Sequence, residues 1–277
     1  PMVKILACQV AVPNVTSKAQ RNDHVAKVAR CISENLALHA ADLVVLPELS
    51  TISYSREAFA NLNELAESLE DETVRTFSEV SKAHNTAICF GMPRRDDRGR
   101  YFISQVVVGP DGSCMGHFDK LHMAQFGASM EKEYFTKGEG LFLFTVGGLK
   151  VAPIICYDLR FPELTQTLCL KHGVDVILHS VAFFRDDTYA SWHSFAVTRA
   201  LENQVFFVSL NRAGPGFGHS IFCPPWVSDM AEVTHFGEGE VFLELEVSPQ
   251  RLDDARKEYS FRTDRRGDYD TMLCISK

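Results

Sequence analysis

The sequence lacks both the long apolar run of a membrane segment and the concentrated basic charge of a nucleic-acid-binding surface. No window approaches the roughly 18 uninterrupted apolar residues that a membrane-spanning helix needs. The net charge is −8, from 28 basic and 36 acidic residues, and the basic residues are scattered along the chain. Proteins that bind nucleic acids usually present a clustered basic face. We therefore expect neither a membrane nor a nucleic acid as partner.

Closely spaced metal-ligand motifs are absent as well. None of the eight cysteines forms a Cys-x-x-Cys pair, and no His-Glu-x-x-His sequence occurs. A zinc site is therefore not expected, and nothing in the sequence implies another metal or a cofactor. The cysteines mostly lie in apolar stretches, which predicts reduced thiols in a cytoplasmic protein. The first residues carry no charged leader before an apolar segment, so we expect a strand there and not an export signal.

No linker-like or low-complexity stretch divides the 277 residues, so one domain over residues 1–277 is expected. The hydropathy pattern predicts strands over residues 3–10, 43–46, 86–92, 101–108, 149–156, 174–180, 205–210, 219–223 and 241–247. It predicts helices over residues 19–41, 67–84, 162–172 and 191–203, and a last helix after Ser248-Pro249. Pro110-Asp111-Gly112 is typical of a hairpin turn. Strands in two groups with helices between them favour an α/β protein with two stacked sheets.

Cys156 is the strongest candidate for a reactive residue. It ends the apolar run Val151–Ile155 and precedes a helix-like segment that begins at Pro162. A side chain on such a strand–turn–helix elbow projects beyond the end of the strand, as the serine of many hydrolases does. A thiol becomes a strong nucleophile once its pKa is lowered. Cys156 is therefore predicted to be a nucleophile.

Two further ionisable residues follow short apolar strands. Glu48 comes after Val45-Leu46-Pro47, and Lys120 comes after Phe118-Asp119. Strand ends are the places where sites collect in α/β folds. A carboxylate can accept the proton of a thiol, and an ammonium can stabilise both a thiolate and an oxyanion. Together with Cys156, these residues form a chemically sensible catalytic set.

At these positions the chain resembles the nitrilase superfamily of carbon–nitrogen hydrolases. Leu46-Pro47-Glu48, Asp119-Lys120-Leu121-His122 and the segment 156–164 are similar to the three signature segments of that family. The similarity continues through residues 199–204, 218–226 and 261–266. The resemblance implies a four-layer α-β-β-α sandwich and a Glu-Lys-Cys triad.

The resemblance also implies how the triad works on an amide. Cys156 attacks the carbonyl carbon, while Glu48 takes the thiol proton, passes it to the leaving amine and then activates water. Lys120 and the backbone N–H of Tyr157 bind the tetrahedral oxyanion.

A fourth polar residue is implied as well. In the family a second glutamate stands seven residues before a glycine, and Glu131 has that spacing from Gly138. Glu133 is a nearby alternative. This glutamate would orient Lys120 or the substrate.

The residues after the thiol are similar to the amidase branch of the family, which includes ω-amidase and deaminated glutathione amidase. Cys156-Tyr157-Asp158 differs from the Cys-Trp-Glu that nitrile hydrolysers commonly carry. The resemblance implies hydrolysis of a small carboxamide to a carboxylic acid and ammonia. A nitrilase or an N-carbamoyl amide hydrolase with the same triad is one alternative, and a non-catalytic scaffold is another.

Several residues are candidates for substrate contact. The segment 182–193 departs from the ω-amidase pattern and is bulkier, with Ser191 where His is usual. Arg185 either pairs with a substrate carboxylate or is solvated. The predicted substrate contacts are Tyr54, Tyr157, Phe184, Arg185 and Trp192. The resemblance further implies a homodimer or larger homo-oligomer, in which the tail from about residue 261 crosses to a partner.

Overall fold

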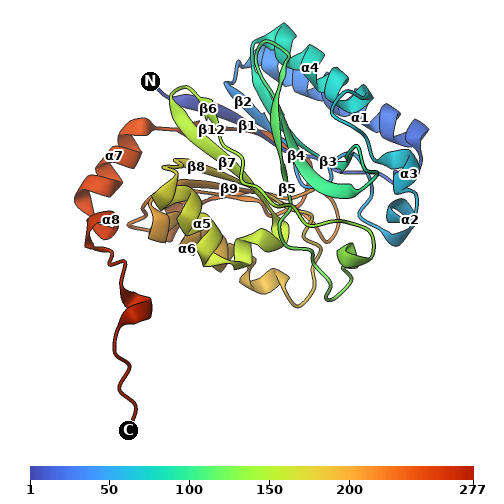
Figure 1. Ribbon diagram of the computed structural model, residues 1–277. Coiled ribbons are helices and arrows are strands. Elements are labelled where there is room, and N and C mark those ends of the chain that lie inside the picture. Colours follow the sequence, from blue (N-terminus) through green and yellow to red (C-terminus); the bar gives the residue numbers. More distant parts are fainter.

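The computed structural model describes residues 1–277 and contains two six-stranded β-sheets (Figure 1). The strands of the first sheet are β1 (Val3–Gln9), β2 (Leu43–Val45), β3 (Ala87–Arg95), β4 (Tyr101–Val108), β5 (Cys114–Asp119) and β12 (Val241–Val247). Their order is β12-β1-β2-β3-β4-β5. The second sheet contains β6 (Phe144–Val146), β7 (Leu149–Ile155), β8 (Val176–Ser180), β9 (Phe206–Leu210), β10 (Ile221–Cys223) and β11 (Thr234–His235). Its order is β11-β10-β9-β8-β7-β6.

Helices cover the outer face of each sheet. Helices α1 (Lys18–Leu38) and α4 (Glu72–His84) lie on the first sheet, and α5 (Pro162–Gln166) and α6 (Trp192–Asn203) lie on the second (Figure 1). The remaining helices are α2 (Arg56–Phe59), α3 (Leu62–Leu65), α7 (Pro249–Glu258) and α8 (Phe261–Asp264). Single turns are η1 (Glu131–Glu133), η2 (Cys156–Arg160), η3 (Thr167–Lys171), η4 (Tyr189–Ser191), η5 (Met230–Glu232) and η6 (Tyr269–Thr271). The predicted four-layer α-β-β-α sandwich is confirmed.

The strands hold the layers together because their side chains alternate between two apolar cores. Ile5 and Ala7 belong to a cluster of 22 buried residues between the sheets. Leu6 and Cys8 point the other way, into a cluster of 19 that includes residues of α1 and α4. A third cluster, of 33 residues, joins the second sheet to α5, α6 and the loops around Cys156.

The strand directions bring three chain segments to one edge of the sandwich. Strands β2 and β3 are parallel, and two antiparallel pairings through β4 give β5 the same direction. Strands β7, β8 and β9 are also parallel to one another. Glu48, Lys120 and Cys156 follow the carboxyl ends of β2, β5 and β7. Ligand sites in α/β folds gather at such carboxyl ends.

The prediction of a helix over residues 67–84 was wrong in its first turn, because α4 begins only at Glu72. The backbone of Glu67 instead bridges β3, with its N–H donating to Pro93 O and its carbonyl accepting from Arg95 N. Its carboxylate lies 3.2 Å from the buried guanidinium of Arg21. These tertiary contacts outweigh the local helical pattern. The predicted hairpin at Pro110–Gly112 is confirmed by the antiparallel pairing of β4 with β5.

None of the helices combines the length and the apolar character that crossing a membrane requires. After α8 the chain leaves the body of the protein, and the segment drawn in red ends far from the sheets (Figure 1). This tail exposes several large apolar side chains, including Leu273 (86% exposed) and Ile275 (76%).

Candidate active site

Glu48 lies on a turn, formed by Leu46–Ser50, that follows β2. The next residue, Leu49, has a φ of 46°, a left-handed conformation that turns the chain sharply after the carboxylate. The Glu48 side chain is fully buried. Its Oε1 accepts a hydrogen bond from Lys120 Nζ at 2.9 Å, and its Oε2 accepts one from the backbone N–H of Ala182 at 3.0 Å. Burial raises the pKa of Glu48, and the Lys120 ammonium opposes that shift.

Lys120 places a buried ammonium between two carboxylates. It follows β5, and its Nζ lies 2.9 Å from Glu48 and 2.8 Å from Glu131. Burial alone would lower the pKa of Lys120, but the carboxylates of Glu131 and Glu48 outweigh burial and hold the pKa well above its usual value. Lys120 therefore stays charged at neutral pH.

The structure distinguishes the two candidate glutamates. Glu131 is 1% exposed and accepts hydrogen bonds from Lys120, from the backbone N–H of Ala124 and from the hydroxyl of Tyr54 at 2.5 Å. Glu133 lies on the surface, where it pairs with Arg56. Glu131 is thus the glutamate that contacts Lys120.

Cys156 sits on a strained elbow between β7 and η2. Its φ is 47°, so this L-residue adopts the left-handed conformation that is uncommon outside glycine. Its carbonyl accepts a hydrogen bond from the buried His179 Nε2 at 2.9 Å. Burial, followed by the charge of Glu48, raises the pKa of the thiol, while Lys120 and the N–H of Ala182 lower it. The thiol is therefore protonated at rest and needs a base to become a nucleophile.

The elbow is fixed to the Lys120 loop by one buried carboxylate. Asp158 is fully buried, and its Oδ2 accepts from the backbone N–H of Ile155 at 3.1 Å. Its Oδ1 lies 2.7 Å from His122 Nδ1 and also accepts from the His122 N–H at 3.1 Å. Asp158 thereby holds together two chain segments that lie more than thirty residues apart in the sequence.

Cys156 lines a cavity of about 340 Å³ with a mostly apolar wall. The lining residues are Tyr54, Ala124, Phe126, Ala128, Ser129, Cys156, Tyr157, Arg160, Ala182, Phe183, Phe184, Asp186, Thr188 and Phe217. Glu48, Lys120 and Glu131 are buried and do not line it, but the charges of all three act on the Cys156 thiol. A reacting carbonyl held at Cys156 would lie within the field of all three.

The predicted substrate contacts divide into two groups. Tyr54, Tyr157 and Phe184 line the cavity. Trp192 does not, and this expectation is corrected: its ring is fully buried against Phe183, and its Nε1 donates to Ser209 Oγ at 2.7 Å.

Arg185 is also absent from the cavity wall. Its Nη2 lies 3.0 Å from His219 Nε2, and its guanidinium lies over the ring of Tyr189. Neither His219 nor Tyr189 lines the cavity. The Arg185 side chain is exposed, as the alternative of a solvated arginine predicts.

Comparison with known proteins identifies the family. A carbon–nitrogen hydrolase family model matches residues 7–257. The chain belongs to the carbon–nitrogen hydrolase family. Omega-amidase NIT2-B of Xenopus laevis is 27% identical over 263 residues, which cover 91% of this chain and 92% of that protein. A nitrilase of Pyrococcus abyssi is 35% identical over 240 residues, which cover 80% of this chain and 87% of that protein.

A solved structure confirms the fold. Nit3 of Saccharomyces cerevisiae, a member of branch 10 of the nitrilase superfamily, superimposes with a TM-score of 0.80 at 24% identity. The match covers 93% of this chain and 94% of that chain. The family match confirms the resemblance that the three sequence segments predicted, and the solved structure confirms the fold.

Sequence reasoning missed Arg212, which follows β9 at the same edge of the sandwich. It is 4% exposed, and its Nη2 donates to the carbonyls of Glu48 and Leu49 at 3.2 and 2.7 Å. Burial lowers the pKa of Arg212 to about 10, so the guanidinium remains charged at neutral pH. With Lys120 it provides two positive charges against the carboxylates of Glu48 and Glu131. The only indication of Arg212 in the sequence is a cationic residue two positions after a buried strand.

Arg160 was also missed as a wall residue. Its guanidinium donates to Ser191 Oγ at 2.7 Å and to Thr188 O at 2.8 Å, and it lies over the ring of Phe195. No group of three His, Cys, Asp or Glu side chains in the chain is arranged to hold a metal ion.

Proposed function

We propose that the protein hydrolyses a small carboxamide to a carboxylic acid and ammonia through a thioester on Cys156. The observation that carries this proposal is a cavity-lining thiol that lies in the electrostatic field of a buried carboxylate–ammonium pair, Glu48 and Lys120. Membership of the carbon–nitrogen hydrolase family supports amide hydrolysis in general, and omega-amidases are among the relatives.

The first half of the reaction forms the thioester. Glu48 accepts the thiol proton as the sulfur of Cys156 bonds to the carbonyl carbon. The carbonyl oxygen becomes an oxyanion, which Lys120 and the backbone N–H of Tyr157 stabilise. The C–N bond then breaks, Glu48 returns the proton to the leaving nitrogen, and ammonia departs.

The second half regenerates the thiol. Water attacks the thioester carbonyl while Glu48 removes a proton from it, and the collapse of the second oxyanion breaks the C–S bond. The carboxylic acid leaves and the sulfur regains its proton. Glu131 keeps Lys120 charged and oriented, because it is the nearer of the two carboxylates to the ammonium.

The lining of the cavity favours an amide with a short apolar acyl group. Ten of the fourteen lining residues are hydrophobic. The only cation among them is Arg160, which uses one Nη1 and one Nη2 donor to bind Ser191 and Thr188. Asp186 adds a carboxylate to the wall. A carboxylate elsewhere on the substrate would therefore meet a mostly apolar surface and the like charge of Asp186.

A substrate panel tests the proposal. Purified protein is incubated with butyramide, with the mono-amide of a dicarboxylic acid, with an N-carbamoyl amine and with a nitrile, and ammonia, carbon dioxide and acid are measured. We expect ammonia and butyric acid from butyramide, at a higher rate than from the acidic amide. Carbon dioxide from the carbamoyl compound alone, or turnover of the nitrile alone, would replace amide hydrolysis by the corresponding alternative.

Two cysteine variants serve as matched controls. Cys156→Ala is expected to remove turnover. Cys169→Ala removes another buried thiol that does not line the cavity, and it is expected to keep the wild-type rate. An inactive wild type on every compound, with both variants folded, would favour the non-catalytic scaffold.

We also propose that the protein self-associates through its tail. Met272, Leu273 and Ile275 are exposed, and the tail extends away from the body (Figure 1). Apolar side chains on a projecting segment are suited to a groove on a second copy. Light scattering should give at least twice the chain mass for the full chain and a smaller mass after truncation beyond Asp264. Leu38→Ser, which removes an equally exposed leucine from the end of α1, is expected to change nothing.

A further inference from the structure

The turn that carries Glu48 presents three successive backbone carbonyls to buried side chains. Arg212 Nη2 donates to the carbonyls of Glu48 and Leu49 at 3.2 and 2.7 Å. The ring nitrogen Nε2 of His24 lies 2.8 Å from the carbonyl of Ser50. A carbonyl can only accept, so His24 carries its proton on Nε2. These three acceptors lie outside regular secondary structure, and the two side chains satisfy them.

Arg212 has no carboxylate partner that would otherwise explain its burial. Its side chain makes two hydrogen bonds, from Nη2 to the two carbonyls. Its backbone N–H donates to Asn211 Oδ1, and its carbonyl accepts from the N–H of Gly218. Its Nε has no partner at all. Taking a guanidinium out of water is costly unless its charge and donors are used. Here the Nη2 donors hold the turn, and the positive charge favours the ionised carboxylate of Glu48.

We propose that Arg212 and His24 are positioning residues that hold the Leu46–Ser50 turn, and with it the Glu48 carboxylate, against Cys156. The proposal rests on the hydrolase function above, since it assigns a task to residues that do not touch the reacting atoms. Arg212 approaches the turn from the second sheet, and His24 approaches it from α1. The turn is thus held from the second sheet and from the helix layer that covers the first sheet.

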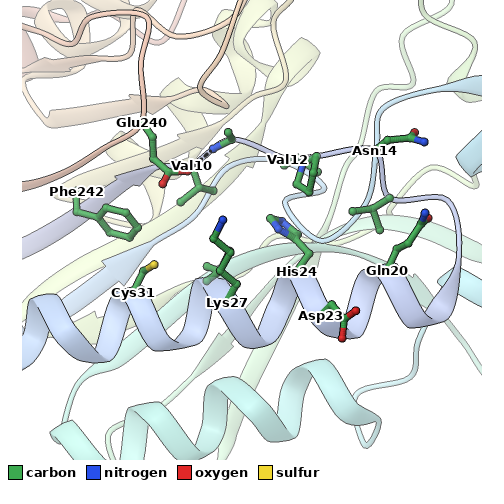
Figure 2. Close-up of a pocket in the computed structure, with 14 residues that line it drawn as sticks. Val10, Val12, Asn14, Gln20, Asp23, His24, Lys27, Cys31, Glu240 and Phe242 are labelled. Atoms are coloured by element: carbon green, nitrogen blue, oxygen red, sulfur yellow. Dashed lines mark hydrogen bonds between the residues drawn. The ribbon is translucent and has the colours of Figure 1, made fainter.

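His24 can be reached without entering the Cys156 cavity. It forms part of the wall of a second cavity, of about 420 Å³, between α1, the segment 10–15 and the start of β12 (Figure 2). In Figure 2, His24 and Lys27 point from α1 into this space, and Phe242 and Glu240 border it on the side of β12. The two cavities share no lining residue. A small molecule can therefore replace the imidazole while the Cys156 cavity remains free.

The first test replaces Arg212. Arg212→Met removes the charge and both hydrogen bonds, and a displaced base is expected to lower kcat by roughly 10²-fold with little change in KM. Arg212→Lys keeps the charge but not the paired donors, so an intermediate kcat is expected. The matched control is Arg21→Met: Arg21 is 2% exposed, and its Nη1 also donates to two successive carbonyls, Glu64 and Leu65, away from the site. This control is expected to keep the wild-type kcat.

The pH profile separates positioning from a general loss of packing. The acidic limb of kcat/KM reports deprotonation of the base. The ionisable groups that act on Glu48 are Lys120, Glu131, Arg212, Cys156 and Tyr54. Removing one positive charge from this set favours the protonated carboxyl. Arg212→Met should therefore move the acidic limb to higher pH, whereas Arg212→Lys and Arg21→Met should leave it in place.

The second test uses chemical rescue at His24. His24→Gly removes the ring that serves the Ser50 carbonyl and enlarges the second cavity. We expect kcat to fall about tenfold and to recover when imidazole is added. Imidazole is expected not to rescue Arg212→Met, whose site lies outside that cavity, and not to accelerate the wild type.

The inference is overturned if Arg212→Met and His24→Gly both keep the wild-type kcat and pH profile. It is also overturned if Arg21→Met loses as much activity as Arg212→Met at equal thermal stability. If Arg212→Met does not fold, Arg212→Lys and the rescue of His24→Gly decide the matter. The pH dependence of Cys156 alkylation by iodoacetamide compares the ionisation of the site in wild type and variants without a substrate. An inactive wild type refutes the proposed function, whereas an active wild type with indifferent variants refutes only the positioning role.

Discussion

Replacement of Lys120 by Met tests the electrostatics of the site most severely. The substitution keeps most of the side-chain volume but removes the ammonium that contacts Glu48 at 2.9 Å and Glu131 at 2.8 Å. One of the two oxyanion donors disappears, which by itself costs about 10²–10³-fold in rate. The thiolate also loses the cation that lowers the pKa of its thiol, so a larger loss of kcat is expected, with the protein still able to fold.

The same substitution leaves two carboxylates buried together. Removing one partner of a buried ion pair costs about 3–5 kcal/mol of stability. Either Glu48 or Glu131 should take up a proton in the folded variant, because a neutral carboxyl avoids the cost of an unpaired buried charge. Its folded-state pKa then lies above its unfolded value, so its stabilising contribution is present at low pH and is lost as the pH rises toward the folded-state pKa.

The stability deficit of Lys120→Met should therefore grow with pH. Each pH unit in this window is worth about 1.4 kcal/mol for one carboxyl, so lowering the pH from about 7 to about 5 should recover about 2.7 kcal/mol. Urea unfolding of wild type and variant at both pH values measures the difference. Arg21→Met, which breaks the buried contact with Glu67, controls for the loss of any buried ion pair. Turnover by Lys120→Met within tenfold of wild type, or a deficit that does not depend on pH, would refute this reasoning.

Two further substitutions and the pH profile of the wild type have expected outcomes. Tyr54→Phe removes the hydroxyl that donates to Glu131, and steady-state kinetics should show kcat lowered about tenfold; an unchanged rate would remove Tyr54 from the mechanism. Because burial raises the pKa of Glu48, the acidic limb of the wild-type kcat/KM profile should lie above the ordinary carboxyl range near pH 4.3, and a limb below it would contradict the assignment of the base. Asp158→Asn weakens the buried contacts to Ile155 and His122, so scanning calorimetry should show a lower Tm, and equal Tm values would show that the carboxylate is dispensable.

The sequence predicts the layers of this fold because its strands alternate or are uniformly apolar, and its long helices have helical periodicity. Ile5 and Leu6 face opposite cores as period-2 alternation requires. The start of α4 escapes prediction because Glu67 is used by a bridge to β3 and by Arg21, two partners far away in the sequence. Local periodicity contains no information about such contacts.

The candidate site divides in the same way. Glu48, Lys120 and Cys156 are predictable because each stands in a short segment with its own chemical logic. The residue type alone does not tell where a side chain points. The Trp192 ring packs against Phe183, and the Arg185 guanidinium contacts His219. Arg212 is invisible in the sequence because its task depends on carbonyls more than 160 residues away.

In the proposed mechanism the sulfur of Cys156 bonds covalently to the acyl carbon of an amide. The most direct measurement is the intact mass of the protein, acid-quenched within the first turnovers of butyramide, followed by peptide mapping. We expect the mass increase that results when one butyryl group replaces the thiol hydrogen, located on Cys156 and absent from Cys156→Ala. A wild type that turns over the amide without an adduct on this residue, together with a Cys156→Ala protein that remains active, would contradict it.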